Sequence, residues 1–181
     1  VVAEAKDGRI ERFSVGDYAP IMMFERPAPS KSGTWLLPAA LVALVVLLVT
    51  ALAWPVSALT RRYYAVPSKL SVGDAQAQRR LRLVAVATVL VWAGWIGLIY
   101  AMMTNISLFS PKMDGYLRAL QVSGAIVFIG GTLVGLWSAR ATLRGGRGWL
   151  ARAWTLLLAA ALLVSLWVAI AFNLLRFSVQ Y

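Results

Sequence analysis

Residues 34–64 read TWLLPAALVALVVLLVTALAWPVSALTRRYY, and this stretch decides the class of fold. No charged residue occurs between Ser32 and Thr60, and most positions are aliphatic. A membrane-spanning helix needs about 20 mostly apolar residues, so the stretch is long enough to cross a bilayer. Two arginines and two tyrosines follow at once, which is typical of the point where a helix leaves the hydrocarbon for the headgroups.

Three later stretches have the same uncharged, apolar character: Leu83–Pro111, Ala119–Ala139 and Ala153–Leu175. Because hydrocarbon offers the backbone no hydrogen-bond partner, such segments are expected to be helices. The sequence therefore predicts an all-α membrane protein, a bundle of four transmembrane helices. The predicted spans cover about 34–59, 81–106, 116–139 and 149–175.

The composition indicates the same class and excludes several kinds of chemistry. Of the 181 residues, 60% are hydrophobic and 14% charged, and the mean hydropathy is +0.73. Soluble domains carry about 25% charged residues. The sequence contains no cysteine and no histidine, which excludes disulfides, Cys/His zinc sites and a Ser-His-Asp triad within these residues.

Basic residues are concentrated in two of the links between the predicted spans. The links 60–82 and 140–152 together hold 10 of the 18 basic residues and 9 of the 11 net positive charges. The positive-inside rule predicts that both links face the cytoplasm, with both termini outside. The expected topology and interface anchors are Trp35, Trp54, Arg61, Arg62, Tyr63, Tyr64, Arg79, Arg80, Arg82, Arg140, Arg144, Arg147, Trp149 and Arg152.

A net charge of +11 is also found in nucleic-acid-binding proteins. Here the basic links are short and are held at the bilayer at both ends. Attraction to anionic headgroups, worth about 1 kcal/mol per basic residue near the surface, accounts for them. We therefore expect the partner of these links to be a lipid bilayer with anionic headgroups, and no nucleic acid.

Residues 1–31 differ in kind from the remainder of the chain. Asp7-Gly8 is a type I′ turn signal between two short β-prone runs, which predicts a β-hairpin. Two strands alone are marginal in water, so the hairpin is expected to complete a larger extracytoplasmic β-domain. A Pro-rich connector follows it. The sequence is thus divided into residues 1–31, the end of that β-domain with its connector, and residues 32–181, the transmembrane domain.

Catalytic and ligand-binding motifs are missing from the sequence. It has no Ser-x-x-Lys, no Gly-x-Ser-x-Gly and no P-loop, and RGGRG at 144–148 is interpreted as a flexible basic link. All seven acidic residues fall outside the predicted spans, which argues against a metal site in the bundle and against ion-coupled transport. We predict no catalytic, cofactor-binding or metal-binding residue and no cofactor.

Gly131 and Gly135 form a Gly-x-x-x-Gly pattern in the third predicted span. Small residues at this spacing allow two helix backbones to approach closely. The pattern is interpreted as helix packing within the chain, and a homo-oligomer interface is the alternative.

The run LLVTALAWPVSALTRRYY, residues 47–64, resembles a stretch in the C-terminal membrane region of bacterial β-lactamase-related serine hydrolases. Upstream, DGRIERFSVGDYAPIMMFERP, residues 7–27, is similar to the end of the small β-domain that follows the hydrolase domain in some of them. The resemblance implies a location in a bacterial inner membrane, with an N-terminal hydrolase domain outside it that carries Ser-x-x-Lys. Because that motif is missing here, no catalytic residue is carried over to this chain.

Two functional hypotheses follow from these observations. The first is a membrane-anchoring C-terminal domain that tethers and orients such a hydrolase, its partner in the same polypeptide. A start at Val1, within a β-prone run, is expected for the C-terminal piece of a longer protein. The alternative is a stand-alone small membrane protein with a structural, assembly or channel-like role.

Overall fold

The computed structural model describes residues 2–6, 9–14, 23–25, 28–64, 72–105, 113–145 and 148–175. For residues 2–25, Arg61 and Val72 it describes the backbone alone. The chain divides into two compact units, Val1–Leu37 and Pro38–Tyr181. The boundary therefore falls inside the first long helix rather than at the predicted position 31/32.

The first unit contains three short strands: β1 (Val2–Lys6), β2 (Arg9–Ser14) and β3 (Met23–Glu25). They form an antiparallel sheet in the order β1-β2-β3. The predicted turn at Asp7-Gly8 lies outside the described residues. Within the predicted connector, β3 pairs with the end of β2, so that Phe24 is opposite Phe13. Phenylalanine favours strands, but the prolines nearby in the sequence predicted a connector here instead of a strand.

The register of β1 and β2 explains why their apolar alternation looks imperfect in the sequence. Ala3 is opposite Phe13 and Ala5 is opposite Ile10, with a register shift between Glu4 and Ala5. Such a bulge inserts one extra residue into a strand and reverses the alternation beyond it.

A single 3₁₀ turn, η1 (Pro29–Lys31), precedes the first long helix in the same unit. The indole Nε1 of Trp35 donates a hydrogen bond of 2.9 Å to the carbonyl oxygen of Pro29. The hydroxyls of Ser32 and Thr34 are also bonded, at 2.7 Å. These contacts join the first turn of the helix to η1, which is the physical reason why the unit boundary lies beyond residue 32.

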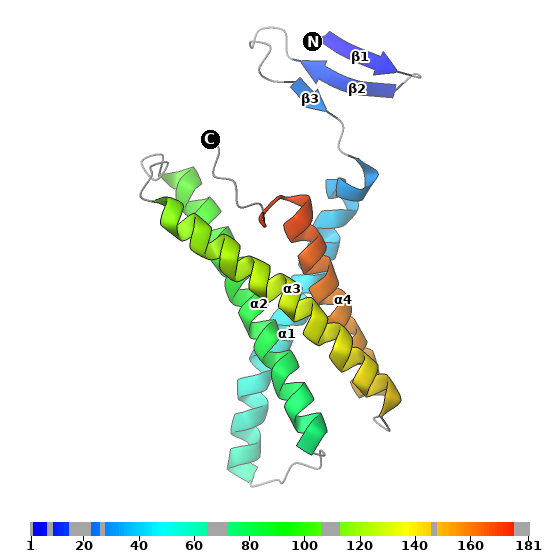
Figure 1. The fold of residues 1–181 in the computed structure, drawn as a ribbon, viewed down its shortest axis with the longest axis vertical. Coiled ribbons are helices and arrows are strands. Elements are labelled where there is room, and N and C mark those ends of the chain that lie inside the picture. Colours follow the sequence, from blue (N-terminus) through cyan, green and yellow to red (C-terminus); the bar gives the residue numbers. More distant parts are fainter. Residues whose placement is uncertain are drawn as a thin grey trace. The chain divides into compact units, whose positions relative to one another are not determined.

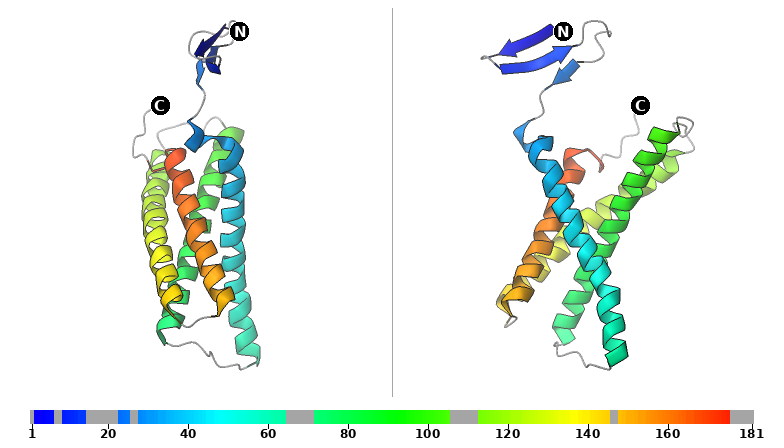
Figure 2. Two further views of the ribbon diagram at one scale, coloured as in Figure 1. Left: turned by 90° about the vertical axis from the view of Figure 1, so that its right-hand side faces the viewer. Right: turned by 180° about the vertical axis from the view of Figure 1, so that it is seen from behind.

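The four predicted helices are all present: α1 (Gly33–Tyr64), α2 (Val72–Thr104), α3 (Asp114–Arg144) and α4 (Trp149–Ala171). All four are long and apolar enough to cross a membrane, which makes this a multi-pass membrane protein. Their directions alternate along the chain (Figure 1). We call the end of the bundle that holds Tyr64, Val72, Arg144 and Trp149 the basic end (Figure 2).

Three helices extend beyond the predicted spans at the basic end. α1 continues from 59 to Tyr64, α2 begins at Val72 instead of 81, and α3 continues from 139 to Arg144. The predicted bounds were those of the uncharged stretches. The length of such a stretch reflects the thickness of the hydrocarbon layer and not the full length of the helix. Alanine, glutamine and arginine are good helix formers, so helix geometry continues where the chain meets the headgroups.

α4 ends earlier than predicted, at Ala171 instead of 175. Asn173 has a positive φ of 55°, a left-handed conformation that asparagine tolerates better than most residues. The N–H of Asn173 bonds to the carbonyl of Ile170, and the N–H of Leu174 bonds to the carbonyl of Ala169. This is the Schellman arrangement, which satisfies the last carbonyl groups and stops the helix while the sequence is still apolar.

Small residues determine how closely α3 packs in the middle of the bundle. A Cβ atom added at Gly131 would lie 2.8 Å from Val84 Cγ1 of α2, and one at Gly135 would lie 2.8 Å from Leu162 Cδ1 of α4. The hydroxyl of Thr132 donates to the Phe128 carbonyl of its own helix at 2.7 Å and also lies 3.3 Å from the carbonyl oxygen of Leu162 in α4. Both glycines therefore lie at contacts between helices of one chain.

Two apolar clusters fill the bundle. One joins α1, α2 and α4 through Ala43, Val46, Leu47, Leu81, Ala85, Leu158, Ala161 and Leu162. The other, formed by Val91, Trp95, Phe128 and Ala169, joins α2, α3 and α4. Toward the basic end, the α1–α2 pair diverges from the α3–α4 pair (Figures 1 and 2).

Candidate functional site: a polar pocket at the basic end of the bundle

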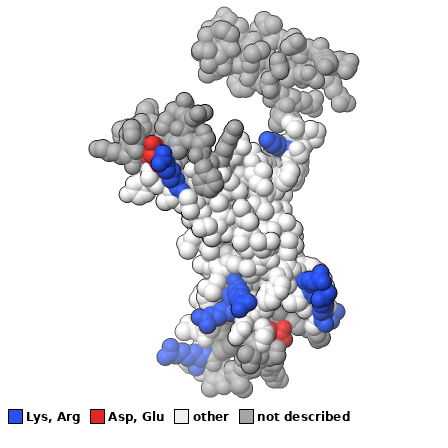
Figure 3. All heavy atoms as spheres, viewed as in Figure 1, with Lys and Arg blue, Asp and Glu red and all other residues white. Residues whose placement is uncertain are grey.

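Basic side chains gather at the basic end on the face of the molecule that Figure 3 shows. The predicted anchors with described side chains are Arg62, Arg79, Arg80, Arg82, Arg140, Arg144 and Arg152. Asp74 is the acidic residue at this end. Arg147 and the side chain of Arg61 lie outside the described residues. A strongly positive surface at the edge of the apolar spans is what an anionic headgroup region attracts.

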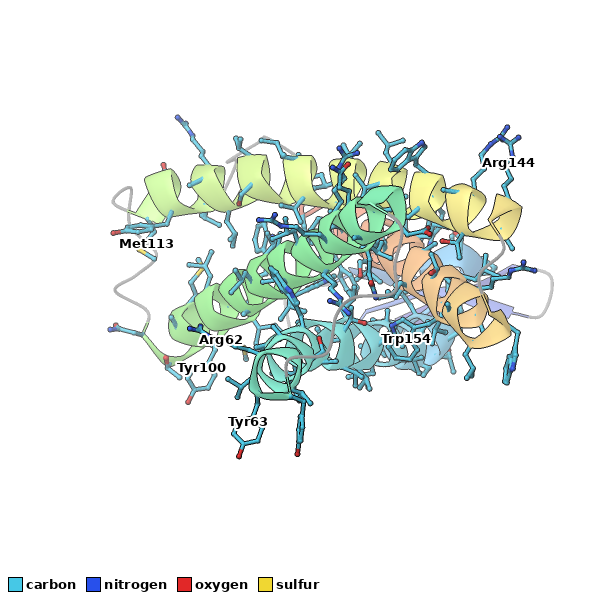
Figure 4. All side chains as sticks on the ribbon, turned by 90° about the horizontal axis from the view of Figure 1, so that it is seen from below. Arg62, Tyr63, Tyr100, Met113, Arg144 and Trp154 are labelled. Carbon is cyan, nitrogen blue, oxygen red and sulfur yellow. The ribbon has the colours of Figure 1, made fainter. Side chains whose placement is uncertain are left out.

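The aromatic anchors take different positions. Tyr63 and Tyr64 are exposed at the end of α1, with their rings edge to face at 5.1 Å, and Trp149 is exposed at the start of α4 (Figure 4). Trp54 is half-buried in α1, and Trp35 is held by η1. The three exposed rings at the basic end have the amphipathic character that favours a membrane interface.

Two of the predicted anchor arginines make specific contacts within the bundle. The guanidinium carbon of Arg80 lies 5.7 Å from the ring centroid of Trp137, a cation–π contact between α2 and α3. Arg152 Nη2 donates a hydrogen bond of 2.9 Å to the carbonyl of Gly145 and so joins the end of α3 to the start of α4. These arginines therefore connect helices as well as meeting the headgroup region.

A pocket of about 170 Å³ opens where the helix pairs diverge. We call it the Ser138 pocket. All four helices line it, with Thr50, Ala53, Ala77, Gln78, Leu81, Arg82, Ser138, Thr142, Ala151, Trp154, Thr155 and Leu158. None of these lining residues is acidic. Cavities of about 150 Å³ accommodate a ring the size of benzene, so the pocket has room for a small polar group.

The hydroxyl groups of the pocket fall into two kinds. Those of Thr50, Thr142 and Thr155 each donate to the carbonyl four residues earlier in their own helix, at 2.8 Å. Ser138 is 2% exposed, and its Oγ is buried without a hydrogen-bond partner. A buried hydroxyl left without a partner costs about 1–3 kcal/mol. Ser138 thus supplies a donor that no protein group uses.

The remaining polar groups of the pocket are also donors. Arg82 is half-buried and carries five N–H donors in a planar fork, and Gln78 offers an amide NH₂. Ala151 belongs to the first turn of α4, where the helix dipole favours negative charge. Trp154 of α4 projects into the space beside α1 (Figure 4). Taken together, these groups suit an oxyanion with an apolar attachment.

Two other hollows have a different character. One, of about 340 Å³, lies between α1 and α4 and has only apolar lining, from Pro38 to Val46 and from Leu157 to Val164. The other, of about 700 Å³, lies between α2 and α3 near Gly94 and Met113. Ser123 lines it, but its hydroxyl already donates to the carbonyl of Leu120. Neither offers a buried donor without a partner.

Arg82 was predicted from the sequence as an anchor, whereas Ser138, Gln78 and Thr142 were not predicted as site residues. A signal for two of them was present. Ser138 and Thr142 follow Gly131 and Gly135 at spacings of three and four residues, which places all four on one face of α3. This face opens into a pocket only because the two helix pairs diverge. The spacing of small residues along α3 does not predict that divergence.

Comparison with known proteins finds no matching family model, no matching curated protein and no matching solved structure. In the described ranges, no group of three or more carboxylates could hold a metal ion.

Proposed function

We propose that this chain is a membrane anchor, the C-terminal domain of an extracytoplasmic serine hydrolase related to β-lactamases. It tethers and orients that enzyme at a bacterial cytoplasmic membrane. The observation that carries the anchoring role is the set of four helices, each long and apolar enough to cross a membrane. The buried polar residues of the described bundle are threonines, serines and one glutamine. Carboxylates of the kind that ion-coupled transport uses are not among them.

The small sheet supports the idea of a folded domain before the first helix. Its order β1-β2-β3 leaves β1 and β3 as the two outer strands of the described sheet. An unpaired strand edge invites a further strand, and a small sheet needs a hydrophobic face or a packing partner to be stable. In the proposal, these strands complete the β-domain of the tethered enzyme, and the resemblance of residues 7–27 to such a domain points the same way.

The proposed orientation places the basic end in the cytoplasm and both termini outside, following the positive-inside rule. The chain has no natural cysteine, so single introduced cysteines report topology without background. We expect Ala65→Cys and Gly145→Cys to be labelled by a membrane-impermeant maleimide only after permeabilisation. Asp17→Cys and Lys112→Cys are expected to react in intact cells. The reverse pattern would overturn the orientation.

The hydrolase proposal is tested on the polypeptide with the sequence that precedes Val1 in its gene. We expect that sequence to contain Ser-x-x-Lys, and the membrane-bound protein to be acylated at this serine by a fluorescent penicillin. The serine-to-alanine variant is the control, and it should remain in the membrane without acquiring label. An upstream sequence without Ser-x-x-Lys, or a start codon directly before Val1, would favour the stand-alone membrane protein instead.

A further inference from the structure

We propose that the Ser138 pocket is a binding site for the phosphate group of an anionic phospholipid. The general attraction between basic links and headgroups needs no defined site, whereas this inference assigns one pocket with named donors. It does not depend on the nature of any domain before the first helix. The proposal starts from the buried Oγ of Ser138, which has no hydrogen-bond partner and lines a pocket shared by all four helices.

The donors of the pocket match a phosphate in number and in charge. Ser138 Oγ supplies a neutral donor, Gln78 an amide, and Arg82 a guanidinium fork whose geometry fits two oxygens of one phosphate. Arg82 already has an interaction within the protein, and its guanidinium carries five N–H groups in all. The N-terminal turn of α4 at Ala151 adds its dipole.

The apolar part of the lining favours a lipid over a free phosphate ion. Leu81, Leu158 and Trp154 contribute to the same pocket as the donors. A hydrated inorganic ion gains nothing from these walls, whereas the glycerol and upper chain segments of a phospholipid would cover them. The pocket also straddles the border where uncharged helix gives way to arginine-rich helix, on the side of the apolar spans that faces the headgroups.

The experiment measures stabilisation of the purified 181-residue chain in a neutral detergent. Short-chain phosphatidylglycerol is titrated in, and the midpoint of thermal unfolding reports binding, because a ligand of the folded state raises it. Parallel titrations use short-chain phosphatidylcholine and inorganic phosphate. We expect saturable stabilisation by phosphatidylglycerol, with little effect from the other two.

The variants separate the pocket from the surrounding surface charge. Arg82→Gln is expected to weaken phosphatidylglycerol binding about tenfold, because it removes a charge-assisted pair. Ser138→Ala should weaken it about fivefold through loss of one hydrogen bond. Arg79→Gln removes an exposed arginine of the same helix that does not line the pocket, and should change the affinity by less than about twofold. Ser165→Ala is the matched serine control, since its hydroxyl is bonded to the Ala161 carbonyl.

Each other outcome would overturn the proposal. Equal weakening by Arg79→Gln and Arg82→Gln would indicate diffuse surface attraction. Equal stabilisation by phosphatidylcholine would indicate an apolar groove without anion recognition. Equal stabilisation by inorganic phosphate would assign the pocket to a free oxyanion rather than a lipid. If Arg82→Gln does not fold, the comparison of Ser138→Ala with Ser165→Ala decides alone.

Discussion

One face of α3 packs against other helices in the middle of the bundle and lines a pocket at the basic end. Its buried positions recur at alternating spacings of three and four residues through Gly124, Phe128, Gly131, Gly135, Ser138 and Thr142. In the middle of the bundle, Gly131 and Gly135 bring α2 and α4 close to the backbone. At the basic end, Ser138 and Thr142 take the same positions and line a pocket. A heptad-like stripe therefore gives contact where the partner helices converge and a cavity where they diverge.

The difference shows what small residues do in a membrane bundle. Lipid tails are as apolar as leucine, so helices associate through close packing and hydrogen bonds rather than through exclusion of water. Glycine in the middle achieves the packing, whereas serine at the basic end leaves a hydroxyl unbonded. The stability of the middle of the bundle is thus expected to depend on side-chain volume at Gly131 and Gly135. That of the basic end is expected to depend on the polarity of the side chain at position 138.

The largest expected effect is on packing in the middle. Gly135→Leu should lower the free energy of unfolding by about 3 kcal/mol, because even a Cβ atom there meets Leu162 at 2.8 Å and the Ala159 backbone at 3.5 Å. Gly130→Leu is the matched control, since a Cβ at Gly130 meets nothing within 4 Å and leucine favours helix. Thermal unfolding in detergent compares the two. Similar midpoints would mean that α3 and α4 do not pack through this face.

At the basic end, a substitution is expected to increase the stability of the protein in the same thermal unfolding measurement. Ser138→Ala is expected to raise the free energy of unfolding of the lipid-free protein by about 1 kcal/mol, since it removes a buried hydroxyl that has no partner. If Ser138→Ala also weakens phosphatidylglycerol binding, the hydroxyl contributes to lipid binding and not to the stability of the fold. A destabilised Ser138→Ala protein would instead indicate that the hydroxyl is used for folding.

A smaller effect is expected where α2 and α3 meet outside the pocket. Arg80→Gln should cost about 0.5–1 kcal/mol through loss of the cation–π contact with Trp137. A double-mutant cycle with Trp137→Leu isolates the pair from the general effect of removing one charge. Additive single effects would show that the contact contributes nothing to stability.

The smallest effect concerns the hydrogen bond between α3 and α4. Thr132→Val should cost about 0.6 kcal/mol, because the hydroxyl shares its one proton between the Phe128 carbonyl of its own helix at 2.7 Å and the Leu162 carbonyl of α4 at 3.3 Å. Thr88→Val, where the hydroxyl donates to the Val84 carbonyl of its own helix, serves as the comparison. If Thr132→Val lowers the stability no more than Thr88→Val does, the bond to Leu162 does not contribute to the contact between α3 and α4.

Hydrophobicity predicted the helices better than it predicted their ends. The four helices follow from uncharged stretches, and the glycine pair was recognised from its spacing. The ends differ because α2 continues through Arg79 and Arg82 in a region where lipid no longer sets the limit. The end of α4 is set by the left-handed backbone at Asn173, a local conformation that hydropathy does not register.

The sequence by itself determined that the chain forms membrane helices, because long uncharged segments have no other way to satisfy their backbone in lipid. It also determined that arginines gather at one set of helix ends, since charge cannot enter the hydrocarbon at low cost. Only the tertiary structure decided that Ser138, Gln78 and Arg82 face one pocket. Their convergence depends on the angle at which two helix pairs separate, and that angle is set by contacts between residues far apart in the chain.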